Sequence, residues 1–177
     1  AALAMRIRCE SMCDIGAAMT PHNAFLLLQG LETLSLRMQQ HVSNAQAMVT
    51  WLQQQEAVAW VNHPDIDADT HTKTLFPKGA GSMLTFGVKG GRDAGAAFIN
   101  ALQLSSNLAN VGDSRTLVLH PGSTTHSRLS ETDLVAAGIS ADLIRVSVGI
   151  ETLKDIQADF SLGLRAAAKI VANQVEA

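Results

Sequence analysis

Apolar residues recur every three or four positions over residues 21–54, which is the period of an α-helix. Thr20 and Pro21 open this stretch, and a threonine N-cap followed by proline is a typical helix start. Gly30 costs about 1 kcal/mol relative to alanine inside a helix, so we expect a break into two helices near residues 30–35. The apolar positions are Leu27, Leu31, Leu34, Met38, Val42, Ala45, Val49 and Leu52.

The rest of the chain alternates short strand patterns with short helical ones. Strands are predicted over residues 57–64, 82–90, 105–112, 116–121 and 141–151. Helices are predicted over residues 93–103 (N-cap Asp93), 130–138 (N-cap Ser130) and 152–175. Residues 65–81 are polar and contain proline and glycine, which predicts a loop. This order indicates an α/β (α+β-like) fold, in which helices cover a small, mainly antiparallel sheet.

The amino-acid composition and net charge argue against several classes of partner. The chain has 177 residues, 47% of them hydrophobic, which is enough for one domain with an appended element. The net charge of −3 and the absence of a Lys/Arg cluster argue against a nucleic-acid partner or an anionic membrane surface. The longest apolar run, residues 24–28, is far shorter than the roughly 20 residues of a membrane span. We therefore expect no membrane partner.

The first residues look like a helix that is already under way. Residues 3–19 have apolar positions at helical spacing with no cap before them, which suggests that the natural N-terminus lies upstream. Charged residues stand where a signal peptide would have its apolar core. Cys9 and Cys13, the only cysteines, are expected as reduced thiols on one helix face, since further metal ligands are missing nearby. These features predict a cytoplasmic location.

Arg145 is the candidate of most interest, because it interrupts an apolar strand pattern. If Ile144 and Val146 face the core, Arg145 shares the other face with Ser147 and Gly149, whose small side chains leave room around the guanidinium group. A guanidinium group binds a carboxylate through two parallel hydrogen bonds. The alternative is a solvent-facing arginine on a half-exposed strand, and the strand pattern by itself favours it.

Four other candidates have ordinary structural explanations. Lys73 could be compared with a Schiff-base lysine, but nearby aspartates would keep it protonated, so a solvated lysine is favoured. Residues 65–71 have acidic spacing but lack the glycine and the distal glutamate of a calcium loop. His120 and His126 form no evident catalytic arrangement and are expected to be structural. Asn107 could donate to an anion, although a turn role is favoured.

Taken together and in order, four segments resemble the trans-sulfuration (cysteine and methionine metabolism) family of pyridoxal-phosphate enzymes. They are DIGAAMTPHNAFLLLQGLETLSLRMQQH, PKGAGSMLTFGVKGG, HPGSTTHSRL and LIRVSVGIETLKDIQADFSLGL, and they span nearly the whole chain. The segment NLANVGDSRTLVLHPGSTTHS is most similar to the O-acetylhomoserine sulfhydrylase (aminocarboxypropyltransferase) branch.

The resemblance implies the C-terminal part of the fold type I (aspartate-aminotransferase-like) transferases. Residues 1–20 would be the last part of the large cofactor-binding domain, and residues 21–177 the C-terminal substrate-side domain, entered by long connecting helices over residues 21–54. The family's Schiff-base lysine, pyridinium aspartate, phosphate cup and stacking tyrosine would all lie upstream. The chain contains no tyrosine, so it cannot supply the last of these. Pyridoxal 5'-phosphate would thus be bound by the absent N-terminal domain.

By the same resemblance, Arg145 would bind the α-carboxylate of the substrate, Asn107 would touch the same carboxylate, and Thr125 would line the pocket. The implied reaction of the intact enzyme is γ-replacement, in which O-acetyl-L-homoserine and sulfide or a thiol give homocysteine or a thioether and acetate. The chain alone would be inactive, and the intact enzyme a homodimer or homotetramer. Alternatives are the γ- or β-lyase branch and a non-catalytic domain that binds a carboxylate or a partner.

Overall fold

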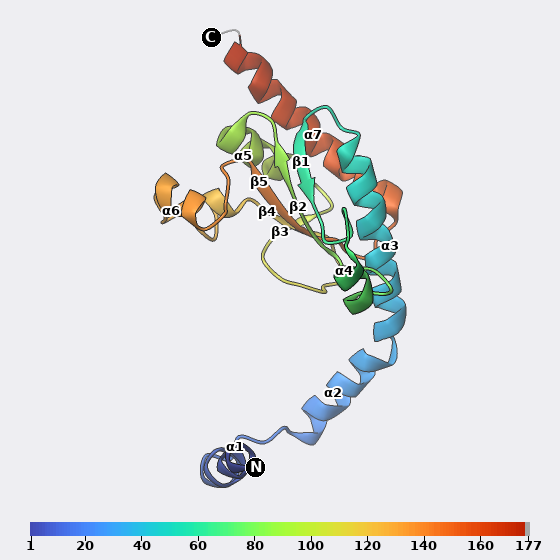
Figure 1. The fold of residues 1–177 in the computed structure, drawn as a ribbon, viewed down its shortest axis with the longest axis vertical. Helices are drawn as coiled ribbons and strands as arrows, with labels where there is room; N and C mark the ends of the chain where they lie inside the picture. The colour runs from blue at the N-terminus through green and yellow to red at the C-terminus, as the bar shows by residue number, and fades with distance from the viewer. Residues whose placement is uncertain (176–177) are drawn as a thin grey trace. The chain divides into compact units, whose positions relative to one another are not determined.

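The computed structural model describes residues 1–175, which fall into two compact units, Ala1–Leu36 and a second unit that begins at Arg37 (Figure 1). Each unit is described by itself. The first contains the helices α1 (Ala2–Arg6), η1 (Ile7–Asp14) and α2 (Pro21–Glu32), followed by the first residues of α3 (Leu34–Gln53).

The break predicted near residues 30–35 is confirmed, because α2 ends at Glu32 and α3 begins at Leu34. Thr20 is the N-cap of α2, and its side chain accepts a hydrogen bond from the Asn23 backbone N–H at 3.3 Å. The expected helix at the start of the chain is present, but η1 is a π-helix, so its turns are wider than those of an α-helix. Cys9 and Cys13 are both free and exposed on it.

The second unit is built on a five-stranded sheet in the order β1-β2-β5-β4-β3. Its strands are β1 (Val58–Asn62), β2 (Met83–Val88), β3 (Ser106–Asn107), β4 (Leu117–Leu119) and β5 (Leu143–Ser147). Every pairing is antiparallel except that of β3 with β4. The predicted small, mainly antiparallel sheet is therefore confirmed, and β5 is its central strand.

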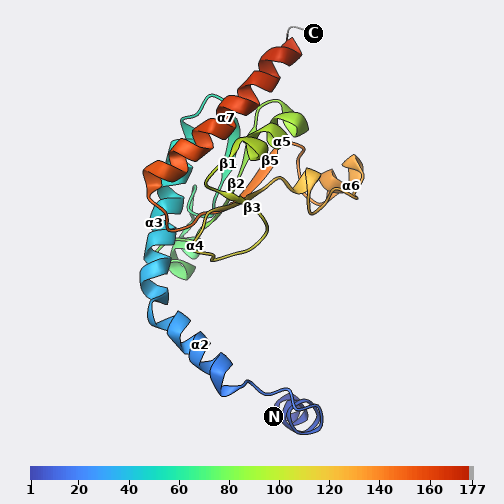
Figure 2. The same cartoon turned by 180° about the vertical axis from the view of Figure 1, so that it is seen from behind.

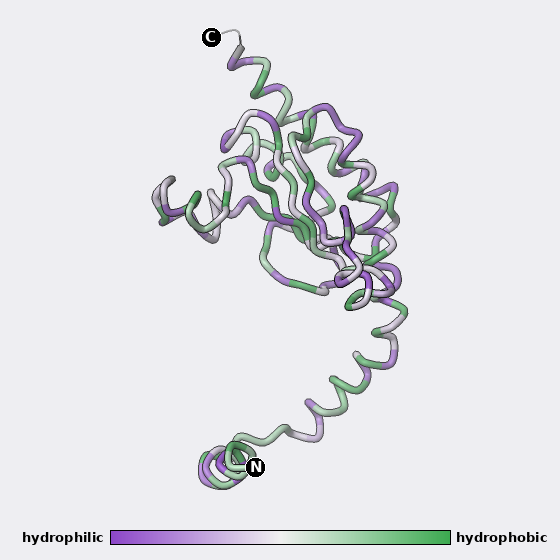
Figure 3. The backbone as a smooth tube through the Cα atoms, in the orientation of Figure 1, coloured by the Kyte–Doolittle hydropathy of each residue, from purple (hydrophilic) through white to green (hydrophobic). Residues whose placement is uncertain are grey.

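Three helices of the second unit contribute to one hydrophobic core. These are the C-terminal part of α3, α5 (Gly91–Ala101) and α7 (Leu153–Val175), and Figure 2 shows α5 and α7 in front of the sheet. Phe98 of α5 packs edge-to-face against Phe86 of β2 and Phe160 of α7, each at a ring-centroid distance of 5.4 Å. Figure 3 shows the apolar strands in the middle of this unit. The helices therefore cover one face of the sheet.

Two local predictions were wrong. Residues 65–81 contain a short helix, α4 (Thr70–Leu75), because the Asp69 side chain caps it by accepting a hydrogen bond from the Thr72 N–H at 2.7 Å. The helix α5 is capped by Gly90, whose φ of 100° favours glycine, and Asp93 lies inside the first turn. The predicted Ser130 cap is confirmed for α6 (Glu131–Ala136).

Candidate functional site

Arg145 lies in the middle of the central strand, on the face of the sheet that the core helices do not cover. Its neighbours across the sheet are Thr85 on β2 and Leu119 on β4. Directly paired residues project to the same face of a sheet. Ile144 and Val146 project the other way and are fully buried in the core. The alternation predicted from the sequence therefore holds, and it leaves Arg145 half-buried on the open face.

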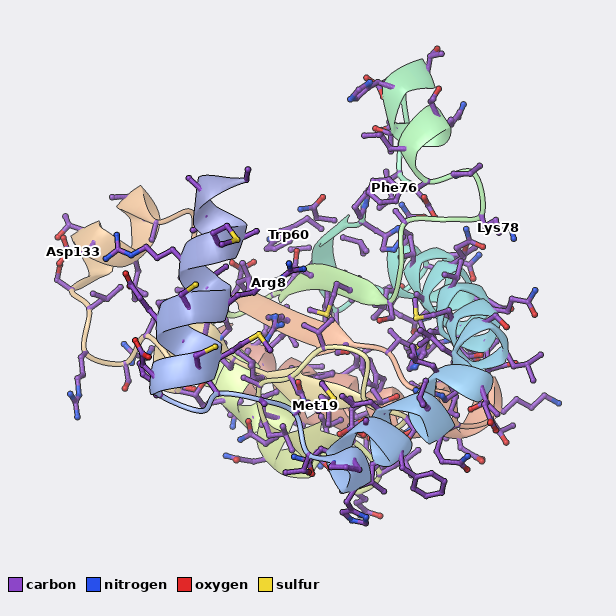
Figure 4. The ribbon with its side chains drawn as sticks, turned by 90° about the horizontal axis from the view of Figure 1, so that it is seen from below. Arg8, Met19, Trp60, Phe76, Lys78 and Asp133 are labelled. Atoms are coloured by element: carbon purple, nitrogen blue, oxygen red, sulfur yellow. The ribbon has the colours of Figure 1, made fainter. Side chains whose placement is uncertain are left out.

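Small residues lie beside Arg145 on β2 and β5, while the buried Leu119 pairs with it on β4. Thr85 and Ser147 lie on the same face, and the Ser147 hydroxyl is buried without a hydrogen-bond partner. Figure 4 shows Trp60 and the segment after α4, with Phe76 and Lys78, on the side of the sheet away from α5. A half-buried guanidinium group with small polar neighbours on β2 and β5 can bind a small anionic ligand.

The segment between α5 and β4, residues 102–116, comes closest to the guanidinium group. The Nη2 of Arg145 donates to the backbone oxygen of Asn110 at 3.5 Å, a long hydrogen bond. Asn107, three residues earlier, is exposed and pairs with Val118 on β4. Val118 pairs in turn with Val146, which faces the core, so the register places Asn107 on the face opposite to Arg145.

Thr125 follows β4 and the short helix η2 (Pro121–Ser123). It is exposed, and its hydroxyl is 2.8 Å from Nδ1 of His126. Within residues 1–175, no hydrogen bond links the side chains of Arg145, Asn107 and Thr125 to one another. They come from β5, β3 and the segment after β4, and β4 lies between β3 and β5 in the sheet.

His120 has the structural role expected for it. Its ring is fully buried, with Nε2 donating to the Ala141 backbone oxygen at 2.8 Å and Nδ1 2.8 Å from the Ser123 hydroxyl. Both ring nitrogens are thus used, and they tie the start of the Thr125 segment to the residues that precede β5.

Asp159 of α7 fixes the N-terminal end of the 102–116 segment. Its carboxylate accepts hydrogen bonds from the backbone N–H groups of Gln103, Leu104 and Ser105 at 2.6, 3.0 and 2.9 Å. Burial acts to raise the pKa of Asp159, but these backbone hydrogen bonds outweigh it and hold the pKa below its ordinary value. The carboxylate is therefore ionised and firmly held at neutral pH.

Glu151 fixes the other end of the same segment. Its Oε1 accepts from the Thr116 backbone N–H at 2.6 Å, and its Oε2 accepts from the Thr116 hydroxyl at 2.8 Å. The same hydroxyl accepts from the Gly149 N–H at 2.9 Å. A Cβ on Gly149 would overlap both the Glu151 carboxylate and the backbone before Thr116, so the close approach requires glycine.

The turn that carries Glu151 is itself held by α3. The Asn44 amide donates to the backbone oxygens of Gly149 and Glu151 at 3.0 and 2.9 Å. His41 Nδ1 donates to the Val148 oxygen at 2.7 Å, and both His41 and Asn44 are buried. The turn between β5 and α7 is thus fixed by side-chain hydrogen bonds as well as by packing.

Sequence patterns did not single out Asp159 or Glu151. A signal was available for Asp159, because it falls within the apolar stripe that Ile156, Phe160 and Leu164 form on α7, and a charge in such a stripe requires buried partners. Glu151 gave no comparable signal, since its partner Thr116 is 35 residues away in the chain.

The lysines of the chain do not fit the covalent attachment point of pyridoxal phosphate. Such a lysine needs a lowered pKa, which burial ordinarily provides. Lys73, the one considered from the sequence, is exposed and lies on α4, and the remaining four are exposed as well: Lys78, Lys89, Lys154 and Lys169.

Asp65 and Asp69, two of the three aspartates before α4, have structural roles. Asp65 accepts hydrogen bonds from the Gln46 side chain at 2.8 Å and the Ala80 N–H at 3.1 Å, and Asp69 caps α4. Among the side chains that the structure describes, no three His, Cys, Asp or Glu residues are grouped as a metal site would require. In the same part of the chain, no helix has the length and apolar character needed to cross a bilayer.

The chain belongs to the family of Cys/Met metabolism PLP-dependent enzymes, whose family model matches residues 3–165. It is 46% identical over 169 residues to the homocysteine synthase of Schizosaccharomyces pombe, covering 94% of this chain and 39% of the relative. It is 43% identical over 166 residues to O-acetyl-L-homoserine sulfhydrylase 1 of Thermus thermophilus, and this match covers 92% of this chain and 39% of the relative.

A solved structure agrees with this assignment. The crystal structure of a putative O-acetylhomoserine (thiol)-lyase from Campylobacter jejuni, which contains N'-pyridoxyl-lysine-5'-monophosphate, matches with a TM-score of 0.79 and 36% identity. The match covers 93% of this chain and 40% of that chain. The fold is therefore that of the corresponding part of this enzyme class, and the chain spans about two fifths of the length of the relatives it matches.

Proposed function

We propose that the chain is the substrate-carboxylate side of an O-acetylhomoserine sulfhydrylase, which converts O-acetyl-L-homoserine and sulfide or a thiol to homocysteine or a thioether and acetate. The observation that carries the proposal is Arg145, a half-buried guanidinium group on the open face of the central strand, with Thr85 and Ser147 beside it. The printed names of the relatives support this substrate class.

In this proposal Arg145 binds the α-carboxylate and fixes the orientation of the substrate. Two parallel hydrogen bonds define a plane, which a single ammonium group cannot do. On the family resemblance, Asn107 of β3 and Thr125 of the segment after β4 are assigned to the same carboxylate. Pyridoxal phosphate, when bound, supplies the electron sink for chemistry at the α-carbon. Because the lysines of this chain do not fit its attachment point, we assign the cofactor to a part of the protein outside these 177 residues.

We also propose that the intact enzyme is a homodimer or homotetramer in the cytoplasm. The apolar side chains that α2 exposes support a covering surface for this helix: Phe25, Leu26, Leu27, Leu28 and Leu31. The mass of the native enzyme by light scattering tests this part of the proposal, and a monomer would contradict it.

The activity is tested in the full-length enzyme that carries these residues, by sulfide-dependent release of acetate from O-acetyl-L-homoserine. Arg145→Ala is expected to lower kcat/KM about 100-fold or more, because the substrate is no longer held in a reactive geometry. Arg145→Lys is expected to retain only a small part of the wild-type kcat/KM. Lysine keeps the positive charge but cannot form the two parallel hydrogen bonds of a guanidinium group. Arg165→Ala is the matched control, because Arg165 is an exposed arginine on α7 and should leave the rate unchanged.

Two results would contradict the proposal. A wild-type kcat/KM for Arg145→Ala would show that Arg145 does not bind the substrate carboxylate. Release of an α-keto acid without added sulfide, in place of the exchange reaction, would identify a lyase of the same family.

A further inference from the structure

The 102–116 segment is an irregular stretch whose two ends are both held by carboxylates. Asp159 holds the backbone of Gln103 to Ser105, and Glu151 holds Thr116. Between them lie Asn107 and Asn110, and the latter is the residue whose backbone oxygen meets Arg145. The two ends of this segment are therefore held by two side chains that, in the described part of the chain, make no hydrogen bond with Arg145.

We propose that Glu151 is a positioning residue of the carboxylate site, acting through Thr116 on the 102–116 segment, with Asp159 as its counterpart at the other end. This inference rests on the proposed function, because it concerns the same site. Its physical basis is a continuous series of hydrogen bonds. Asn44 fixes the turn, the turn presents Glu151, and Glu151 fixes Thr116.

Geometry explains why this position suits a carboxylate. Both Glu151 oxygens accept from Thr116, one from the backbone and one from the hydroxyl, and the hydroxyl is left to accept from Gly149. Hydrogen bonds to an ionised acceptor are about twice as strong as those between neutral groups. Glutamine at this position can still accept from the Thr116 N–H, and its amide can donate to the hydroxyl, so it should preserve most of the geometry. Alanine removes both contacts.

Ser114 and Ile150 add a second connection between the same two segments. The Ile150 N–H donates to the Ser114 backbone oxygen at 2.9 Å. With Glu151 removed, this bond, the Gly149 N–H bond to the Thr116 hydroxyl and the strand pairings of β4 would remain. The segment should therefore keep its course but be held less firmly near Arg145. A loss of this kind weakens recognition of the carboxylate without unfolding the sheet.

The test measures kcat/KM in the full-length enzyme for O-acetyl-L-homoserine and for its α-carboxamide, which lacks the carboxylate. The ratio of the two values is the carboxylate preference. Glu151→Ala is expected to lower this ratio about 10-fold, mainly through KM for the natural substrate. Glu151→Gln is expected to retain most of the ratio. Asp155→Ala removes an equal charge from an exposed position on α7 and should leave the ratio unchanged.

Substitution of Thr116, the hydrogen-bond partner of Glu151, provides a second test of the positioning role. If Glu151→Ala does not accumulate as folded protein, Thr116→Val and Thr116→Ser replace it, since valine removes the hydroxyl and serine keeps it. The carboxylate preference should fall for Thr116→Val and remain unchanged for Thr116→Ser. An equal loss toward both substrates, in either pair of variants, would mean a general structural role and would overturn the inference.

The failure of this inference is distinguishable from failure of the proposed function. Arg145→Ala should abolish the carboxylate preference in the same assay. If it does while Glu151→Ala leaves the ratio intact, only the positioning role is wrong. If Arg145→Ala leaves the ratio intact, the proposed carboxylate site itself is wrong, and the inference falls with it.

Discussion

Asp159 is a buried charged residue in an otherwise apolar stripe of α7, and it connects two parts of the fold. It lies in the apolar stripe of α7 between Ile156 and Phe160, and it is almost completely buried. Three backbone N–H groups from another segment satisfy its carboxylate, which compensates for the loss of water. The residue therefore joins helix α7 to the loop that leads to β3.

The pH dependence of stability follows from the lowered pKa of Asp159. A carboxylate whose pKa is lower in the folded state stabilises the protein above its unfolded pKa of about 4, and this contribution is lost as the pH falls through the folded value. We expect the free energy of unfolding to decrease as the pH is lowered below about 4. Asp159→Asn should cost about 1–3 kcal/mol at pH 7 and weaken the dependence in the acidic range.

Denaturant unfolding of both proteins at pH 7 and in steps below pH 5 measures this difference. Asp155→Asn is the control, because Asp155 is exposed on the same helix. Parallel stability curves for the wild type and Asp159→Asn would show that Asp159 is not the source of the dependence.

At the scale of elements, local patterns predicted most helices and strands, while the connections between them depended on distant contacts. The break between α2 and α3, the Ser130 cap and the β5 alternation all follow from neighbouring residues. The order β1-β2-β5-β4-β3 does not, because it is fixed by pairings between segments far apart in the chain. For the same reason the spacing of Arg145, Asn107 and Thr125 could not be read from their positions in the sequence, and the family resemblance supplied their roles.

The contact between α5 and α7 illustrates an element-level constraint. Gly163 of α7 faces Phe98 of α5, and a Cβ at this glycine would lie 2.6 Å from Phe98 Cδ2. The Phe98 ring is enclosed by Phe86 and Phe160 and cannot easily move away. The glycine is therefore required by helix packing, in spite of its low helix propensity.

Gly163→Ala is expected to destabilise the protein by about 1–3 kcal/mol, because overpacking outweighs the gain in helix propensity. Gly30→Ala in α2 is the matched control, since a Cβ there meets no atom within 4 Å and alanine should be neutral or stabilising. Combining Gly163→Ala with Phe98→Leu should recover part of the loss. Denaturant unfolding of the three variants measures this, and equal effects for both glycines would refute the packing argument.

At the scale of the whole molecule, the proposed function requires residues that this chain does not include. It presents a guanidinium group on a rigid strand, and it presents five lysines that are all exposed. A protein of this family needs a buried lysine for its cofactor. In the proposed function, the chain therefore supplies the carboxylate side of the site, and the cofactor lysine comes from another part of the protein.

The assignment of the cofactor lysine to another part of the protein leads to a prediction about the lysines of this chain. In the full-length enzyme, arginine substitution of all five at once should leave the cofactor absorbance and its reduction by borohydride unchanged. The substituted residues are Lys73, Lys78, Lys89, Lys154 and Lys169. Loss of the absorbance band in this variant would place the attachment point within the chain and contradict the assignment.

The position of β5 in the sheet has a consequence for protein synthesis. The central strand is the last of the five to leave the ribosome, since it follows β1 to β4 in the chain, and α7 comes later still. In the sheet, the β1–β2 pair and the β3–β4 pair are joined by strand pairing only through Leu143–Ser147. Non-local pairing of this kind folds slowly and leaves strand edges unpaired in the meantime. The nascent chain is therefore most exposed to aggregation just before the strand that carries Arg145 closes the sheet.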